Sequence, residues 1–300
     1  MMTVCAGAVK TTSHEVVAQV MAKKIFFVVG CQKSGTTWAQ ELLNGHESAG
    51  CWGEGRFIKL VLAPIGKMME QFNTGHKVRG ASGDTISTTL EKEDFLSVGR
   101  SALCVVFAKW AGDRLAHLTH IGEKTPEHVL SMPLLMDVFP QAKFVHVIRD
   151  GRDGAVSGWH HNVTRGSAQF RQQFPTFADY AAYFGEHHWV RYIRIAQEFA
   201  QMHPDRIHEV RYEALQTEPS VVVKGLLDFL GLAAGDDDVT QCVAAGSFSR
   251  LSGGRQPGQE DTGSHFRKGV VGDWREMFDE RARRRFEEAA GGMLRELGYE

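Results

Sequence analysis

The chain has 300 residues, of which 43% are hydrophobic and 23% are charged, and its formal net charge is −2. This is the composition of an ordinary globular protein with enough chain for one large α/β domain. The near-neutral balance rules out a generally basic surface for nucleic acid or an anionic membrane, so anion binding must be local. The five cysteines are scattered and form no Cys-x-x-Cys pair, which argues for a reducing compartment and against structural zinc.

The sequence predicts no membrane span and no secretory signal. No apolar run approaches the roughly 20 residues that a spanning helix needs. Residues 1–24 are mixed and polar, and we expect them to form an N-terminal arm with at most a short amphipathic helix at 13–21. Residues 25–300 are predicted to form a single domain, and we expect a cytoplasmic location.

The first half of the chain alternates short apolar runs with segments of helical spacing, starting at residues 25–29. That run is rich in β-branched and aromatic residues, and it predicts a buried parallel strand. The elements expected after it are a helix at 36–44, a loop at 45–55, an interrupted helix at 57–72, a loop at 73–90, a helix at 92–110 and a short strand at 119–122.

The second half continues this alternation. The expected elements are a helix that ends at 139, a buried strand at 143–148, a helix to about 161, a loop at 164–175, a long helix at 177–199, a strand at 206–210, a helix at 221–230, a mobile lid at 247–272 and a closing helix at 279–297. Alternating strands and helices predict an α/β fold with a mainly parallel central sheet flanked by helices. Ligands of such sheets bind beyond the carboxyl ends of the strands.

The residues from 30 to 38, after the first strand, read Gly-Cys-Gln-Lys-Ser-Gly-Thr-Thr-Trp. A strand, a glycine-containing turn and a helix point backbone N–H groups at an anion, and Lys33 adds a positive charge. The P-loop of ATP-binding proteins has Lys directly after its second Gly, whereas Thr36 follows Gly35 here. We therefore expect the loop to hold a phosphate, although not as ATP with Mg²⁺. The alternative is an ordinary strand-to-helix turn with an incidental Lys.

A second cluster follows the strand at 143–148. Arg149 stands where that strand ends, and Ser157 lies in the helix after it. A guanidinium fork and a hydroxyl can hold one phosphate between them. Arg152 and the neighbouring aspartates are expected to form local ion pairs and caps.

A third cluster lies in the expected lid, where Arg267 and Lys268 precede Gly269. Two adjacent cations in a glycine-rich segment suit closure over an anion. A charge pair alone is a weak signal, because most such pairs are simply solvated.

These motifs, in this order, resemble those of the sulfotransferases that use 3′-phosphoadenosine 5′-phosphosulfate (PAPS), and the resemblance runs from residue 25 to residue 274. It implies a P-loop-like sulfotransferase fold, PAPS as the co-substrate and 3′,5′-ADP as the product. No carboxylate pair stands out as a metal site, so no metal is expected.

The resemblance also implies roles for individual residues. Those of the 5′-phosphosulfate loop fall on Lys33, Ser34, Gly35, Thr36 and Thr37. Those of the 3′-phosphate site fall on Arg149, Ser157, Arg267, Lys268 and Gly269. Trp38 would stack on the adenine and Tyr212 would approach its edge, and the alternative for both is an aromatic side chain of the core.

Two branches of this family place the proton acceptor differently. One uses the His of a Lys-Thr-His segment, but Pro126 occupies that position here and leaves His128 as a fallback. The other, with tyrosylprotein and several bacterial enzymes, has a Gly-Glu segment after the first helix, which Glu54 matches. We expect Glu54 to be the base, with a pKa raised by a dry pocket. His46 is a weaker candidate, and Lys124 is expected to be a second cation near the sulfuryl group.

The acceptor is the part that the sequence leaves open. A hydroxylated small molecule, a lipid, a carrier-bound intermediate and a peptide tyrosine all fit. The pocket is predicted to be lined by residues 56–90, 160–185 and the lid near 247–266, with Phe57, Trp159, Phe170 and Phe174 as its aromatic side chains. The dimerisation segment of the cytosolic enzymes is not matched, so the oligomeric state is open. A P-loop small-molecule kinase and a nucleotide-binding module without catalysis are the alternative functions.

Overall fold

The computed structural model describes residues 13–80, 89–164, 166, 168–261, 263–264 and 266–299. Within them, five parallel strands form one sheet in the order β2-β3-β1-β4-β5. The strands are β1 (Lys24–Gly30), β2 (Ala49–Gly53), β3 (His120–Lys124), β4 (Lys143–Ile148) and β5 (Ile207–Arg211). The predicted α/β class and parallel sheet are confirmed.

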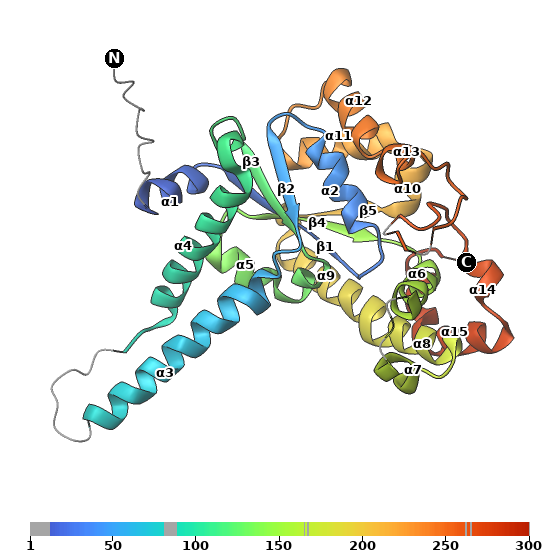
Figure 1. Ribbon diagram of the computed structural model, residues 1–300, viewed down its shortest axis with the longest axis horizontal. Helices are drawn as coiled ribbons and strands as arrows, with labels where there is room; N and C mark the ends of the chain where they lie inside the picture. The colour runs from blue at the N-terminus through green and yellow to red at the C-terminus, as the bar shows by residue number, and fades with distance from the viewer. Residues whose placement is uncertain are drawn as a thin grey trace, which may run out of the picture.

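Helices cover both faces of this sheet (Figure 1). The α-helices are α1 (Ser13–Met21), α2 (Thr36–Asn44), α3 (Ala63–Gly80), α4 (Lys92–Ala111), α5 (Met132–Val138), α6 (Gly151–Thr164), α7 (Ala168–Gln173), α8 (Phe177–Tyr183), α9 (Arg191–Met202), α10 (Tyr212–Thr217), α11 (Pro219–Leu230), α12 (Asp236–Ala245), α13 (Phe248–Leu251), α14 (Trp274–Met277) and α15 (Glu280–Glu296). Wider π turns are η1 (Ile58–Leu62) and η4 (Phe184–Val190), and 3₁₀ turns are η2 (Gly112–Ala116), η3 (Pro126–Ser131) and η5 (Pro204–Arg206).

The central strand β1 divides the core into two layers. Successive side chains of a strand point to opposite faces. Phe27 and Val29 therefore pack with α4, α5, α8, α9 and α15, while Phe26 and Val28 pack with α2, α11 and α12. All four of these side chains are buried. A strand buried on both faces has to be continuously apolar, which is why the sequence at 25–29 predicts it so clearly.

The structure differs from the prediction mainly where glycine or proline suggests a break. β2 occupies the expected loop at 45–55 and pairs with β3 as an edge strand. Helical structure continues across the interruption expected at Pro64: Pro64 is the second residue of α3, and the wider π turn η1 directly precedes that helix, with the N–H of Ala63 bonded to the carbonyl oxygen of Ile58. α3 also continues to Gly80, into the expected loop at 73–90. Among the described residues, five short helices occupy segments in which no helix was expected: α7, α10, α12, α13 and α14.

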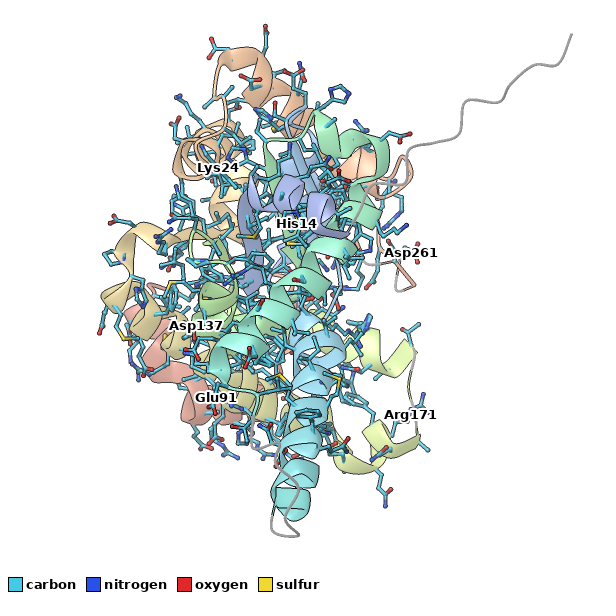
Figure 2. All side chains as sticks on the ribbon, turned by 90° about the vertical axis from the view of Figure 1, so that its left-hand side faces the viewer. His14, Lys24, Glu91, Asp137, Arg171 and Asp261 are labelled. Atoms are coloured by element: carbon cyan, nitrogen blue, oxygen red, sulfur yellow. The ribbon has the colours of Figure 1, made fainter. Side chains whose placement is uncertain are left out.

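Helices α3 and α4 run side by side away from the sheet (Figure 1), and Figure 2 shows both from the outer side of the molecule. One stretch of the described residues, Lys92–Ala116, is long and apolar enough to cross a membrane by length and composition, with 28% of its most apolar window buried. The core helix of a soluble protein passes the same test. The inner face of α4, including Leu103 and Phe107, is buried in the main core.

Candidate active site

Each strand of the sheet leads, at its carboxyl end, to a residue that the sequence analysis singled out. Lys33 follows β1, Glu54 follows β2, Lys124 ends β3, Arg149 follows β4 and Tyr212 follows β5. Because all five strands are parallel, these residues gather at one edge of the sheet. They line a single cavity of about 1040 Å³.

Most of the predicted site residues line this cavity. They are Lys33, Gly35, Thr36, Thr37, Trp38, Glu54, Lys124, Arg149, Ser157, Tyr212, Arg267, Lys268 and Gly269. Ser34, His46 and His128 are not among its lining residues, and all three side chains are buried. His46 lies elsewhere, with its Nε2 3.1 Å from the carbonyl oxygen of Ala233.

The loop between β1 and α2 depends on two glycines. Gly30 has φ +152°, and a Cβ there would lie 2.5 Å from the carbonyl oxygen of Val147 in β4. Gly35 has φ +96°, and a Cβ there would lie 2.5 Å from the ring of Tyr212. Lys33 also has a positive φ, 70°, which is uncommon for a residue with a side chain. Close packing against β4 and α10 therefore fixes a backbone that only glycine can adopt at these two positions.

Arg149 joins the first loop to the segment that precedes α14. Its Nη1 donates to the carbonyl oxygen of Lys33 at 3.4 Å, and its Nη2 donates to that of Val270 at 3.1 Å. The guanidinium carbon lies 4.2 Å from the ring centroid of Tyr212, a cation–π contact. Its Nε is buried and has no hydrogen-bond partner among the described residues. A buried donor without a partner costs free energy, so this Nε–H suits an anion in the cavity.

Asp153 holds the chain before α14 in place. Its two carboxylate oxygens accept from the backbone N–H groups of Gly272 and Trp274 at 2.8 and 2.9 Å, and Arg149 Nη2 lies 3.7 Å away. Burial raises the pKa of Asp153, although Arg149 and the two N–H groups act in the opposite direction. The expected local ion pairs are present, since Arg152 pairs with Asp150 at 2.8 Å and Arg149 lies only four residues before Asp153. The sequence did not predict the two backbone hydrogen bonds that Asp153 accepts from residues more than a hundred positions away.

Arg267 and Lys268 both form ion pairs with Asp273. Arg267 also pairs with Glu260, and Lys268 Nζ lies 2.9 Å from a carboxylate oxygen of Glu276. The burial of Asp273 would raise its pKa, but the bonds from the two cations outweigh it and hold the pKa below its usual value. Arg267 Nε is a second buried donor that lacks a partner within the described chain.

The segment that carries these cations is irregular and is held by Arg255, which donates to four backbone carbonyl oxygens, those of Ser252, Gln259, Phe266 and Arg267. Figure 2 shows Asp261 of this segment and Arg171 of α7 on the same side of the molecule. Phe266 and residues of α7 both line the cavity. The described residues of 252–272, which we call the covering segment, therefore form part of the wall of the cavity that the strand ends also line.

Trp38 and Tyr212 meet edge to face, with ring centroids 5.2 Å apart and an angle of 69° between the rings. The indole Nε1 donates to the carbonyl oxygen of Gly246 at 2.8 Å, which fixes the ring orientation. Both residues line the cavity, and Trp38 is half-buried. An aromatic surface of this kind can stack against a flat base.

Glu54 is held by two cations. Its Oε1 accepts from Lys124 Nζ at 2.9 Å, and its Oε2 lies 3.5 Å from Arg56 Nη2. Partial burial would raise the pKa of Glu54, but the hydrogen bond and charge of Lys124, together with the charge of Arg56, outweigh it and leave the pKa lowered. The expectation of a raised pKa is therefore wrong, since the sequence does not show that Lys124 and Glu54 meet. Glu54 is an ionised carboxylate at neutral pH.

The glycines around Glu54 have a packing reason. A Cβ on Gly53 would lie 2.8 Å from Gln40 Oε1, and one on Gly55 would lie 2.5 Å from the ring of Phe57. No side chain fits at either position without displacing a neighbour. The Gly-Glu-Gly sequence thus lets the chain pass close to α2 and to the core while Glu54 reaches the cavity.

One end of the cavity is aromatic. Its rings belong to Phe170, Phe174, Tyr180, Tyr183, Phe184 and His188. Phe57 and Trp159, which were expected there, instead pack in or against the main core. Tyr180, Tyr183 and Phe184 lie within the predicted range 160–185 without having been named, and His188 lies beyond it. The sequence shows that they belong to one long helix, but it does not show which face of that helix meets the cavity.

Gln32 and Glu127 are among the polar residues that line the cavity but were not singled out in the sequence analysis. Gln32 Nε2 donates to Glu127 Oε1 at 2.8 Å, across the loops that follow β1 and β3. The sequence could have indicated both residues, because Gln32 lies in the loop of residues 30–38 and Glu127 directly follows Pro126 in the segment after β3. Among the described residues, no group of three or more His, Cys, Asp or Glu side chains is placed to hold a metal ion.

Comparison with known proteins identifies the family. A model of the sulfotransferase family matches residues 26–237. Cytosolic sulfotransferase 1 of Arabidopsis thaliana is 29% identical over 153 residues, which cover 44% of each chain. Protein-tyrosine sulfotransferase 1 of Danio rerio is 26% identical over 212 residues, 71% of this chain and 54% of its own. The matched region is thus about half the length of these curated relatives.

A crystal structure of mouse sulfotransferase SULT7A1 complexed with PAP superimposes with a TM-score of 0.55 and 17% identity, covering 94% of this chain and 89% of the mouse chain. At that identity the likeness concerns the fold, which is the P-loop-like fold expected from the sequence. The family match extends over most of the described sheet and includes the loop after β1, Glu54, Lys124, Arg149 and Tyr212. The chain belongs to the sulfotransferase family.

Proposed function

We propose that this protein transfers the sulfuryl group of PAPS to an acceptor hydroxyl and releases 3′,5′-ADP. The main support comes from Arg149 and Arg267, which both line the cavity. The Nε–H group of each is buried and has no hydrogen-bond partner among the described residues. PAP, the ligand of the SULT7A1 structure, is 3′,5′-ADP. A nucleotide with a second phosphate supplies the anion that these donors lack.

The loop after β1 is the proposed site of the 5′-phosphosulfate. The N-terminus of α2 begins at Thr36, so its first backbone N–H groups and the partial positive charge of the helix face this site. Lys33 and the hydroxyls of Thr36 and Thr37 line the same part of the cavity. Gly35 allows the close approach, and the buried Ser34 closes the turn through its N–H bond to the carbonyl oxygen of Cys31 at 3.2 Å.

Arg149, Ser157, Arg267, Lys268 and Gly269 form the proposed 3′-phosphate site. Arg149 and Ser157 come from the end of β4 and from α6, and the other three come from the covering segment. A 3′-phosphate would bridge two parts of the chain that are already linked through Asp153 and Asp273. Trp38 and Tyr212, between the two phosphate sites in the proposed arrangement, would contact the adenine.

PAPS, when bound, supplies the sulfuryl group and a leaving group that carries the electron pair of the broken S–O bond to the 5′-phosphate. Glu54 takes the proton of the acceptor hydroxyl as the new S–O bond forms. Lys33 and Lys124 stabilise the negative charge that grows on the oxygens around the sulfur. Lys124 also holds the Glu54 carboxylate through its 2.9 Å hydrogen bond, so the base and the cation are positioned together.

The pH dependence of turnover distinguishes Glu54 from a histidine base. The pKa of Glu54 in the free protein lies below its usual value of 4.5, so its carboxylate stays ionised as the pH falls from neutrality to that value. We expect kcat/KM to show no acidic limb near pH 6.5, where an ordinary histidine would become protonated. A pH profile from 5 to 8, with folding checked by circular dichroism at each pH, measures this. A limb near 6.5 that persists in Glu54→Gln would assign the base to a histidine.

Nucleotide selectivity separates the proposal from a P-loop kinase. We expect 3′,5′-ADP to raise the melting temperature and ATP with Mg²⁺ to leave it unchanged, because a ligand that binds only the native state stabilises it. We also expect EDTA to leave transfer of radiolabelled sulfate from PAPS unaffected. Stabilisation by ATP with Mg²⁺ and none by 3′,5′-ADP would instead support the kinase. Tight 3′,5′-ADP binding without transfer to any acceptor would support a binding module.

The acceptor is proposed to be a hydroxylated small molecule, a lipid or a carrier-bound intermediate with an apolar or aromatic body. The aromatic end of the cavity, with Phe170 and Tyr183, supports an apolar body. One relative is named for a protein-tyrosine acceptor, so a peptide tyrosine belongs in the same screen. We further propose that residues 25–300 act as one domain in the cytoplasm, without a nucleic-acid partner.

A further inference from the structure

The buried carboxylate of Glu123 lies directly behind the loop that carries Glu54. Its side chain is fully buried at the end of β3. Its Oε1 accepts from the backbone N–H of Gly55 at 2.7 Å and from the hydroxyl of Thr125. A buried carboxylate is stable only when hydrogen bonds or charges compensate its lost hydration. Here part of the compensation comes from Gly55, the residue that follows Glu54.

Thr125 extends this contact by one residue. Its Oγ1 donates to Glu123 and accepts from the backbone N–H of Arg56 at 3.2 Å. Arg56 has φ +45°, a left-handed conformation that residues with side chains rarely adopt. Such a conformation persists only where the surroundings hold it. Glu123 and Thr125 thus hold two consecutive N–H groups of the chain that leaves Glu54.

Consecutive side chains at the end of β3 point to opposite sides, so Glu123, Lys124 and Thr125 contact different parts of the Glu54 loop. Lys124 points to the cavity and holds the Glu54 side chain, whereas Glu123 and Thr125 hold the backbone behind it. His128 closes the other side of Glu123, with Nδ1 2.9 Å from Oε2. The ring of His128 packs against those of Phe27 and Phe57, at 6.0 Å between centroids in each case. This places His128 with Glu123 in the core and not with the acceptor.

We propose that Glu123 and Thr125 are positioning residues that fix the loop of Glu54, so that its carboxylate stays in reach of the acceptor hydroxyl. This inference rests on the proposed function and adds to it a defined support for the base. Catalytic groups lose much of their effect when misplaced by as little as about 1 Å. Loss of the Thr125 hydroxyl releases the backbone N–H of Arg56 without substituting any residue that lines the cavity.

The test compares Thr125→Val with Thr125→Ser. Valine matches the shape of threonine but cannot accept from Arg56, whereas serine keeps the hydroxyl. We expect Thr125→Val to lower kcat by about tenfold or more, with the dissociation constant of 3′,5′-ADP unchanged, and Thr125→Ser to restore turnover. Thr119→Val is the matched control, because Thr119 bonds to Ser48 at the opposite end of β3.

A second comparison asks whether the effect passes through Glu54. In a Glu54→Gln background, Thr125→Val should cause no further loss, because residues that act as a unit are not additive. Equal loss in both backgrounds, equal loss in the valine and serine variants, or wild-type kcat in Thr125→Val would each overturn the proposal.

Amide hydrogen exchange gives a readout that does not need activity. We expect the Arg56 amide to exchange faster in Thr125→Val than in the wild type. Unchanged exchange would overturn the inference that Thr125 fixes the loop of Glu54. If the wild type transfers no sulfate to any acceptor, the proposed function fails by itself. The exchange result still decides whether Thr125 fixes the loop.

Discussion

Replacing Glu54 with glutamine is expected to lower kcat for sulfuryl transfer by about 10²- to 10⁴-fold, the usual contribution of a positioned general base. Glutamine keeps the size of the side chain and an oxygen that can accept from Lys124, but it cannot take a proton. The residue lies at the end of β2, away from the proposed nucleotide contacts of Arg149 and Trp38. The dissociation constant of 3′,5′-ADP should therefore be unchanged, as measured by calorimetry.

A control variant is available at the other end of β2. Glu47 is exposed and stands before β2, so Glu47→Gln makes the same chemical change at the opposite edge of the sheet. We expect this variant to keep wild-type turnover with radiolabelled PAPS. Wild-type turnover in Glu54→Gln would refute the assignment of the base. A parallel loss of 3′,5′-ADP affinity would show instead that Glu54 supports the nucleotide site.

The strands and turns that carry the site could be predicted because their signals are local. β4 has the predicted limits, and β1 extends the predicted strand by one residue at each end, since both are continuously apolar and buried on both faces. Their positions at the centre of a parallel sheet bring Lys33 and Arg149 to the same edge. Once the carboxyl ends of β1 and β4 are predicted, the parallel sheet brings the two cations that follow them to one edge.

The edge strand β2 was missed for an equally physical reason. Its sequence, Ala-Gly-Cys-Trp-Gly, contains two glycines that look like loop residues. In the structure a Cβ on Gly50 would lie 3.0 Å from Leu118 Cδ1, and a Cβ on Gly53 would lie 2.8 Å from Gln40 Oε1 and 2.9 Å from Lys124 Cε. These glycines are required by contacts with distant segments. Local propensity does not contain that information.

Charges also behave in ways that only the fold reveals. The pKa of Glu54 was expected to rise with burial, but Lys124, 70 residues away, forms an ion pair with it and lowers the pKa. Arg267 and Lys268 could be predicted as cations of the covering segment. Their shared pairing with Asp273, and the tie from Asp153 to that segment, required the folded chain. The roles of these residues in binding PAPS stay predictions.

Replacing Arg149 with alanine is expected to weaken binding of 3′,5′-ADP by about 10- to 150-fold, because a hydrogen bond to a charged group contributes roughly 1.5–3 kcal/mol. The proposed contact is with the 3′-phosphate, so affinity for 5′-AMP, which lacks that group, should change little. Calorimetry with both ligands therefore yields a loss of selectivity between them. Arg149→Lys keeps the charge without the fork and should retain part of the selectivity.

Arg206→Ala is the matched control, since Arg206 contacts Gln141 just before β5, at the far edge of the sheet from the cavity. It should leave both affinities unchanged. Arg149 also bonds to the carbonyl oxygens of Lys33 and Val270, so its loss can disturb the fold of the site as well as its charge. The two-ligand comparison separates these effects. An equal fall in affinity for 3′,5′-ADP and 5′-AMP would mean that Arg149 shapes the cavity without recognising the 3′-phosphate. Arg149 would then have to be removed from the proposed 3′-phosphate site.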